Sequence, residues 1–318
     1  MELATEHVRM LDAGRQHISY SSPLTTDCFA SVASKKTQLL QHGNTYGLSF
    51  VALEKGFMVA KHDAFEASCH DYIKRRQEAV DHGQKLTLEE IYALPAAKEV
   101  HLPSIAYWIA LSPDELTVAV AYGDSVALFE VAHILEVEAP TPFQTFSTLQ
   151  VQEIAWCTES SSELFAVLTM EKQVVLCSLA GEKDTIEAQS ASASVCWSPS
   201  GTQIAIGSVN ATIEVYGRSS RRVERSIGQP DCCSDGGFEV HHINWAENEL
   251  ILAGYHKYDE EDEETTAKAC LFEKDEVEKD KCLELDEIVG FFDVENRRHQ
   301  YFSVFLPDWY VAGWSEAM

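Results

Sequence analysis

A strand–turn–strand segment recurs along the chain, and this repeat restricts the fold more than any other feature. Each copy has an alternating apolar strand that ends in a bulky side chain, then a polar turn and a second apolar strand. The bulky residues follow one another at steps of 45, 41 and 48, and they are Leu111, Trp156, Trp197 and Trp245. One four-stranded blade of a β-propeller takes roughly 40–45 residues. The period therefore favours an all-β propeller over a β-sandwich, which also contains many short strands.

The turns and the following strands agree with this assignment. The segments 112–115 and 198–201 each place a proline where its fixed φ suits a tight turn. Third strands of the blades are predicted at 125–129, 173–177 and 212–216. Two further units are predicted at 46–60 and 302–312, so that about six units are recognisable.

One stretch does not follow the repeat. Over residues 62–97 the apolar positions take a helical spacing, with Phe65 and Tyr72 on one face. Residues 87–90 resemble a capping box that opens a short second helix, which Pro95 ends. We therefore predict a helical insertion at 62–97, between the first two blades.

The charge restricts the class of partner. The sequence has 51 acidic and 24 basic residues, with a formal net charge of −27. Such a field repels phosphates and attracts basic protein surfaces, so we expect protein partners and no direct nucleic acid binding. No apolar stretch approaches the roughly 20 residues that cross a bilayer, and no basic region precedes an apolar run at the N-terminus. Neither membrane insertion nor a signal peptide is expected.

The sequence offers no enzyme motif. A GxSxG elbow, a glycine-rich phosphate loop, an HExxH motif and an EF-hand loop are all absent from it. Cys232 and Cys233 precede His241 and His242, but their spacing is not that of a zinc site. We therefore predict no catalytic, cofactor-binding or metal-binding residues. A hydrolase with residues on the central channel is the least favoured alternative.

The topology of a blade predicts one acidic face. The hairpin between the second and third strands and the link that enters the blade emerge on the same face. In the fifth blade, the hairpin at 255–264 contains six consecutive acids, within an acidic loop and connector predicted over 255–287. The link at 229–237 adds two more acids, and we expect a strongly negative face between them, although such runs are also typical of solvated loops. The predicted partner-binding residues are Asp231, Ser234, Asp235, Glu239, Asp259, Glu260, Glu261 and Asp262.

Two segments carry a family resemblance. Residues 193–216 contain Cys196-Trp197-Ser198-Pro199 and closely resemble a blade of the N-terminal propeller of the cytoplasmic-face FG nucleoporins, the nucleoporin 214 / nucleoporin 159 family. The segment 298–309, which begins Arg-His-Gln-Tyr and ends Asp-Trp, is similar to the same family. The segments 46–50 and 102–112 fall in the same order.

The resemblance implies a single WD40-like propeller of seven blades over 1–318, incomplete at the C-terminus because the chain ends inside a blade. It implies a non-catalytic protein without cofactors at the cytoplasmic face of the nuclear pore complex, with other nucleoporins as partners. In that family the propeller binds the DEAD-box RNA helicase of mRNA export, and the contacting loop corresponds to 230–238. A generic WD40-like scaffold of a vesicle coat or a ubiquitin ligase remains the alternative.

Overall fold

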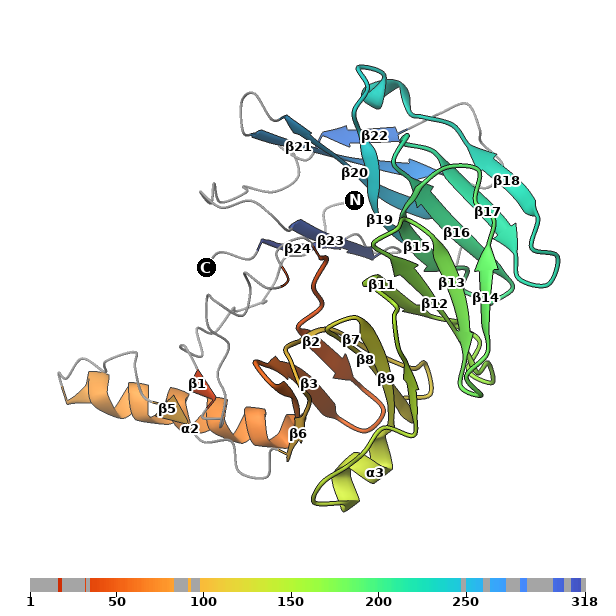
Figure 1. Ribbon diagram of the computed structural model, residues 1–318. Helices are drawn as coiled ribbons and strands as arrows, with labels where there is room; N and C mark the ends of the chain where they lie inside the picture. The colour runs from red at the N-terminus through yellow and green to blue at the C-terminus, as the bar shows by residue number, and fades with distance from the viewer. Residues whose placement is uncertain are drawn as a thin grey trace.

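The structure is a computed structural model that describes residues 17–18, 32, 35–82, 91–92, 98–246, 250–259, 264–272, 281–284, 300–305 and 310–315. Within them, five four-stranded antiparallel sheets follow one another along the chain and are arranged radially (Figure 1). This arrangement confirms the prediction of an all-β propeller. No helix of the described residues is both long and apolar enough to cross a bilayer.

The first sheet contains β2 (Leu40–Gly43), β3 (Leu48–Leu53), β4 (Gly56–Lys61) and β6 (Lys98–His101). The second contains β7 (Ala106–Leu111), β8 (Thr117–Tyr122), β9 (Ser125–Glu130) and β10 (Gln144–Phe146), with the short helix α3 (Val131–Glu136) before β10. The third contains β11 (Val151–Trp156), β12 (Leu164–Thr169), β13 (Val174–Ser178) and β14 (Lys183–Ile186).

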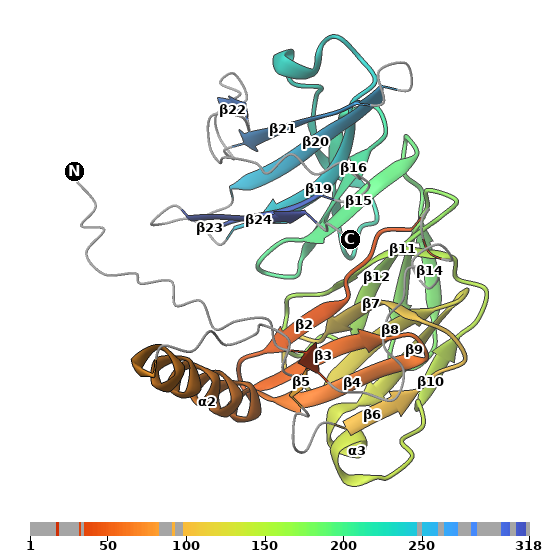
Figure 2. The same cartoon turned by 90° about the vertical axis from the view of Figure 1, so that its left-hand side faces the viewer.

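The fourth sheet contains β15 (Ser192–Trp197), β16 (Gln203–Ser208), β17 (Ile213–Gly217) and β18 (Val223–Ile227). The fifth contains β19 (Glu239–Trp245), β20 (Ile251–Asp259), β21 (Glu264–Phe272) and β22 (Lys281–Glu284). A hairpin of β23 (Gln300–Phe305) and β24 (Tyr310–Ser315) lies between the fifth and first sheets (Figures 1 and 2).

The predicted helical stretch is placed differently from the prediction. Helix α2 (His62–Asp81) directly follows β4, and the chain then returns as β6 to pair with β4. The helix is therefore an insertion within the first sheet, beside which it lies in Figure 2, and not between the first two sheets. The return of the chain to pair with β4 is what keeps the helix inside the blade. In the region of the second predicted helix, Ile91–Tyr92 form a short strand, β5, that pairs with β1 (His17–Ile18). The rest of that region, 83–90 and 93–97, lies outside the described residues.

The acidic segment of the fifth sheet contains more strand than predicted. The ladder between β20 and β21 continues to the pair Asp259 and Glu264, although a loop was expected from residue 255. Strand β22 lies within the region expected as a connector. Residues 255–259, 264–266 and 281–284 therefore form strand where an acidic loop and connector were expected. Tyr255 is aromatic, and Thr265 and Thr266 are β-branched, so both stretches favour an extended conformation. The run of acids between them led to the prediction of a loop.

The bulky residues of the repeat join neighbouring sheets. The indole Nε1 of Trp156 donates a hydrogen bond of 3.0 Å to the carbonyl oxygen of Ala110, in the inner strand of the preceding sheet. The indole of Trp197 donates one of 3.0 Å to Ala155 in the same way. Both side chains are buried, so each hydrogen bond forms inside an apolar interface between sheets. Trp156 and Trp197, which are equivalent positions of the repeat, therefore make the same contact between neighbouring blades.

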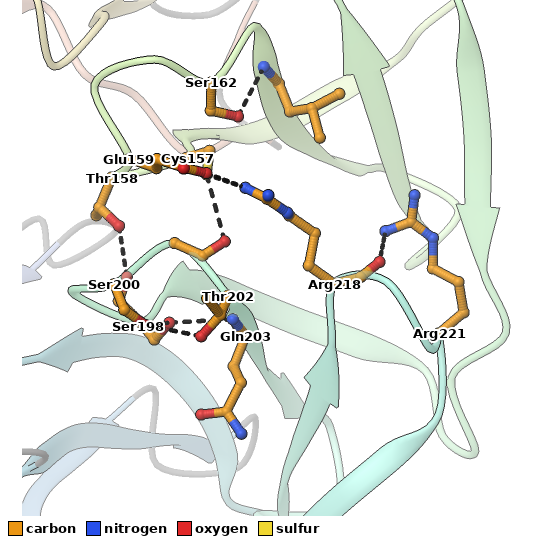
Figure 3. A network of polar contacts seen from close by, with 12 residues as sticks. Cys157, Thr158, Glu159, Ser162, Ser198, Ser200, Thr202, Gln203, Arg218 and Arg221 are labelled. Carbon is orange, nitrogen blue, oxygen red and sulfur yellow. Dashed lines mark hydrogen bonds and ion pairs between the residues drawn. The ribbon is translucent and has the colours of Figure 1, made fainter.

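A polar network also joins the third and fourth sheets (Figure 3). Thr158 Oγ1 donates a hydrogen bond of 2.5 Å to the carbonyl oxygen of Ser198, and Arg218 Nη1 lies 2.5 Å from Glu159 Oε2. Gly201 has a φ of +68°, and a Cβ there would lie 2.9 Å from the Sγ atom of Cys157. The turn after β15 therefore needs a glycine for its conformation and for its close approach to the third sheet.

The segment before the first sheet closes over the inner strands. Four inner strands contain a β-bulge, at Tyr107, Gln152, Ala193 and His241. The segment contacts all four: Gln38 N donates to Tyr107 O, Lys36 N donates to Gln152 Oε1, and Lys36 Nζ donates to Ala193 O at 2.8 Å and His241 O at 2.6 Å. A bulge frees backbone groups from the ladder, and Lys36 binds carbonyl oxygens at two of these bulges.

Lys36 also forms a buried ion pair. Its Nζ atom lies 3.0 Å from Glu153 Oε2, and the two side chains are only 11% and 9% exposed. Burial of each charge is costly, so each requires the other. The pair joins the N-terminal segment to the third sheet, while the carbonyl contacts join it to the fourth and fifth.

Replacing Trp197 by phenylalanine should destabilise the protein more than the same change at Trp245. Trp197→Phe removes the donor to Ala155 and should lower the free energy of unfolding by about 1–2 kcal/mol. The indole nitrogen of Trp245 is buried without a hydrogen-bond partner among the described residues, so Trp245→Phe should cost about 1 kcal/mol less. Urea unfolding of both variants measures the difference, and equal losses would contradict it.

Replacing Lys36 by methionine should leave Glu153 buried and uncompensated. We expect Lys36→Met to lower the free energy of unfolding by about 3–5 kcal/mol, and the double variant with Glu153→Gln to recover part of that loss. Lys61→Met is the matched control, because Lys61 is exposed, and it should stay within about 0.5 kcal/mol of the wild type. A Lys36 variant as stable as this control would show that the ion pair is dispensable.

Candidate functional site

The link between the fourth and fifth sheets presents exposed acids on a rigid base. A single turn of 3₁₀ helix, Asp231–Cys233, starts after Pro230, and its backbone is closed by hydrogen bonds from Cys233 N to Pro230 O and from Ser234 N to Asp231 O. Cys233 and Phe238 are buried in the core of the fifth sheet. Burial raises the pKa of the Cys233 thiol to about 11, so it remains a neutral thiol. Asp231, before Cys233, and Ser234 and Asp235, between Cys233 and Phe238, are exposed.

Two lysines hold this link against the hairpin of β20 and β21. Lys257 Nζ lies 3.4 Å from Asp235 Oδ2, and Lys268 Nζ donates a hydrogen bond to the carbonyl oxygen of Cys232. Both ammonium groups also lie over the ring of Phe238, at 5.8 Å and 4.7 Å from its centroid. Sequence reasoning missed all three residues. The alternation of strands β20 and β21, which puts Lys257 and Lys268 on one face, was the available signal.

The link and the start of the acidic hairpin lie on the same side of the fifth sheet. Lys257, which contacts Asp235, is two residues from Asp259 at the end of β20. The predicted residues Glu260, Glu261 and Asp262 lie outside the described residues. The expectation of a strongly negative surface between the two segments needs correction, because Lys257 and Lys268 lie there. Their charges offset part of the repulsion that a packed acidic surface would create.

Glu239 belongs to a different group of side chains. It begins β19, pairs across the ladder with His256, and its Oε1 atom lies 3.9 Å from His241 Nδ1. One potential ligand atom from each of Glu239, His241 and His256 lies within 4.8 Å of the other two. Glu239 therefore lies beside two histidines, whereas Asp231 and Asp235 are exposed in the link. The sequence places Glu239 and His241 at strand spacing, but only the pairing of β19 with β20 adds His256.

The environment fixes the charges of this group. Burial lowers the pKa of His241 to about 3, and burial also lowers the pKa of His256. The facing His241 imidazole, with a smaller contribution from Lys172, lowers the pKa of Glu239 to about 2. At neutral pH the group therefore contains one carboxylate and two neutral imidazoles.

Similarity to one known propeller structure supports the fold. The chain matches the crystal structure of the Myceliophteria thermophila Cps50 (Swd1) β-propeller domain with a TM-score of 0.52 and 9% sequence identity, over 75% of this chain and 65% of that chain. It also matches a chain of the crystal structure of the Mitotic Checkpoint Complex with a TM-score of 0.47 and 13% identity, over 73% of this chain and 65% of the other. The chain thus spans about two thirds of the length of each. At such identities the likeness to the propeller domain concerns the fold alone.

The family comparison is more specific. No curated protein matches the sequence. A family model described as the NUP159/214 beta propeller matches residues 76–312, which is well over half of the chain. The matched region includes the second to fifth sheets, the link at 230–238 and β23. The chain therefore belongs to the NUP159/214 β-propeller family, as its resemblance to those nucleoporins predicted.

Proposed function

We propose that this chain is a non-catalytic docking propeller of the nuclear pore, which binds the DEAD-box RNA helicase of mRNA export at the cytoplasmic face. The observation that carries the proposal is the link at 230–238. It lies within the region that matches the family, and it presents Asp231, Ser234 and Asp235 to solvent. In the family that the chain resembles, the corresponding loop contacts the helicase. We also propose that the whole propeller has seven blades and contacts other nucleoporins.

The electrostatics of the protein support a basic partner. The net charge of −27 attracts a positively charged surface over long distances, and an RNA-binding surface of a helicase is basic. Such attraction chiefly raises the association rate and weakens as salt is added. The chain itself is expected to repel RNA for the same reason. Docking on this face would therefore compete with RNA for the helicase.

The packing of the link makes it a suitable contact surface. Cys233 inside the link and Phe238 at its end are buried in the core, and Lys257 Nζ lies 3.4 Å from Asp235 Oδ2. A loop that is already held in one conformation loses little conformational entropy when a partner binds. Lys257 pairs with Asp235 and Lys268 lies over Phe238, so neither lysine pairs with Asp231. Among the described residues, Asp231 has no close cationic partner. Asp231 is therefore the acid with most charge available to a partner.

Reversing the charge of the link should weaken helicase binding. We expect the double variant Asp231→Lys and Asp235→Lys to bind the purified helicase roughly 10- to 100-fold more weakly at low salt, with a flatter dependence of affinity on salt. Glu163→Lys is the matched control: Glu163 is exposed in the turn between β11 and β12, on the opposite face of the propeller. Isothermal titration calorimetry at two salt concentrations measures both variants.

Three outcomes would contradict the proposal. An unchanged affinity of the double variant at low salt would exclude this face as the docking site. An equal loss in the Glu163 variant would assign the effect to net charge alone. Failure of the wild-type chain to bind the helicase, together with a pull-down from cell extract that contains no helicase, would favour a scaffold of another assembly.

A further inference from the structure

Glu239, His241 and His256 form a compact group at the inner strand of the fifth sheet. Glu239 and His256 are directly opposite each other in the ladder of β19 and β20. The rings of His241 and His256 lie 4.7 Å apart at an interplanar angle of 60°, so they meet edge to face. Each side chain offers one potential ligand atom, and these three atoms lie within 4.8 Å of one another. Small side-chain rotations would bring them to the distances of about 2.0–2.2 Å at which imidazole nitrogen and carboxylate oxygen bind Zn²⁺.

A β-bulge directs His241 toward this group. Val240 pairs with Tyr255 and His242 pairs with Gly254, so His241 is the extra residue of β19. Its carbonyl oxygen accepts a hydrogen bond from Lys36 Nζ, which fixes the backbone at the bulge. Bulges commonly redirect a side chain next to a functional site. The equivalent bulges of the other inner strands carry Tyr107, Gln152 and Ala193, so this histidine is specific to the fifth sheet.

A buried nitrogen atom in the group lacks a hydrogen-bond partner. The Nδ1 atom of His241 has almost no exposed surface and no hydrogen-bond partner among the described residues, because Glu239 Oε1 is 3.9 Å away. Buried polar atoms are nearly always satisfied, and an exception calls for an explanation. A metal ion bound between the three side chains would satisfy this atom.

The surrounding charges permit a cation. Lys36 lies nearby, but its ammonium group is engaged by Glu153 and by the carbonyl oxygens of Ala193 and His241. The positive charge of Lys172 also interacts with Glu239 and His256, and it would repel a cation bound between them. The carboxylates of Glu239 and Glu153 offset the two lysines, and the local charge is close to neutral before a metal ion binds.

We propose that Glu239, His241 and His256 bind one Zn²⁺ ion, with water in the fourth position. Two imidazoles and one carboxylate are a ligand set typical of zinc, whereas magnesium and calcium prefer oxygen ligands alone. The ion would join β19 to β20. This metal site is independent of the proposed helicase docking, since it requires only the side chains of the two strands.

Metal titration of the purified, metal-free chain tests the proposal. Calorimetry should show one Zn²⁺ per chain, and Glu239→Gln and His256→Gln should each weaken binding at least about tenfold. His101→Gln is the matched control, because His101 is exposed on the outer strand of the first sheet, and it should leave the affinity unchanged. Zn²⁺ should also raise the melting temperature of the wild type and the control but not of the two site variants.

Spectroscopy of the wild-type chain provides a test that needs no variant. Bound Co²⁺ should give the visible spectrum of a tetrahedral nitrogen and oxygen site without a thiolate charge-transfer band, and Zn²⁺ should move the imidazole NMR signals of two histidines. An intense thiolate band would place the ion at cysteines and overturn the proposal. Absence of Zn²⁺ binding, or binding that both site variants retain, would overturn it as well.

Discussion

The packing of each inner strand against the next sheet is the interaction on which the rest of the structure depends. No single four-stranded sheet can bury both of its faces, so each blade is stable only between neighbours. Trp156 and Trp197 occupy these interfaces and add one hydrogen bond each to the preceding strand. The polar network around Glu159 and Arg218 continues the same junction at the surface (Figure 3). A loop between two blades is therefore held by elements on both sides.

An ion pair and charged hydrogen bonds join the inner strands at the centre of the propeller, whereas apolar packing joins the sheets at their interfaces. Bulges in the inner strands leave backbone groups that need partners, and Lys36 supplies a donor to two of them while pairing with Glu153. This links segments that are more than 200 residues apart in the chain, from Lys36 to His241. The same bulge that receives Lys36 turns the His241 side chain toward Glu239. The central contacts and the proposed metal site thus share one piece of backbone.

The exposed link at 230–238 shows how a charged surface can be built on a stable base. Its acids face solvent, while Phe238 is enclosed by the core and by the ammonium groups of Lys257 and Lys268. The lysines reduce the net charge of the surface but hold the loop in place. In this acidic protein, Lys257 and Lys268 position the loop, and exposed acids such as Asp231 contribute to the long-range attraction of a basic partner.

The sequence by itself determined the propeller, because strand alternation and a period near one blade are local patterns that survive without knowledge of contacts. The order of strands in a blade also predicts the side on which each loop emerges, and the contact between Lys257 and Asp235 places the start of the hairpin beside the link. Only the tertiary structure decided that α2 lies within the first blade, that β20 and β21 extend to Asp259 and Glu264, and that Lys257 and Lys268 support the link. It alone brought His256 to Glu239 and His241, because strand register and a single bulge residue are set by pairing between segments and leave no trace in local spacing.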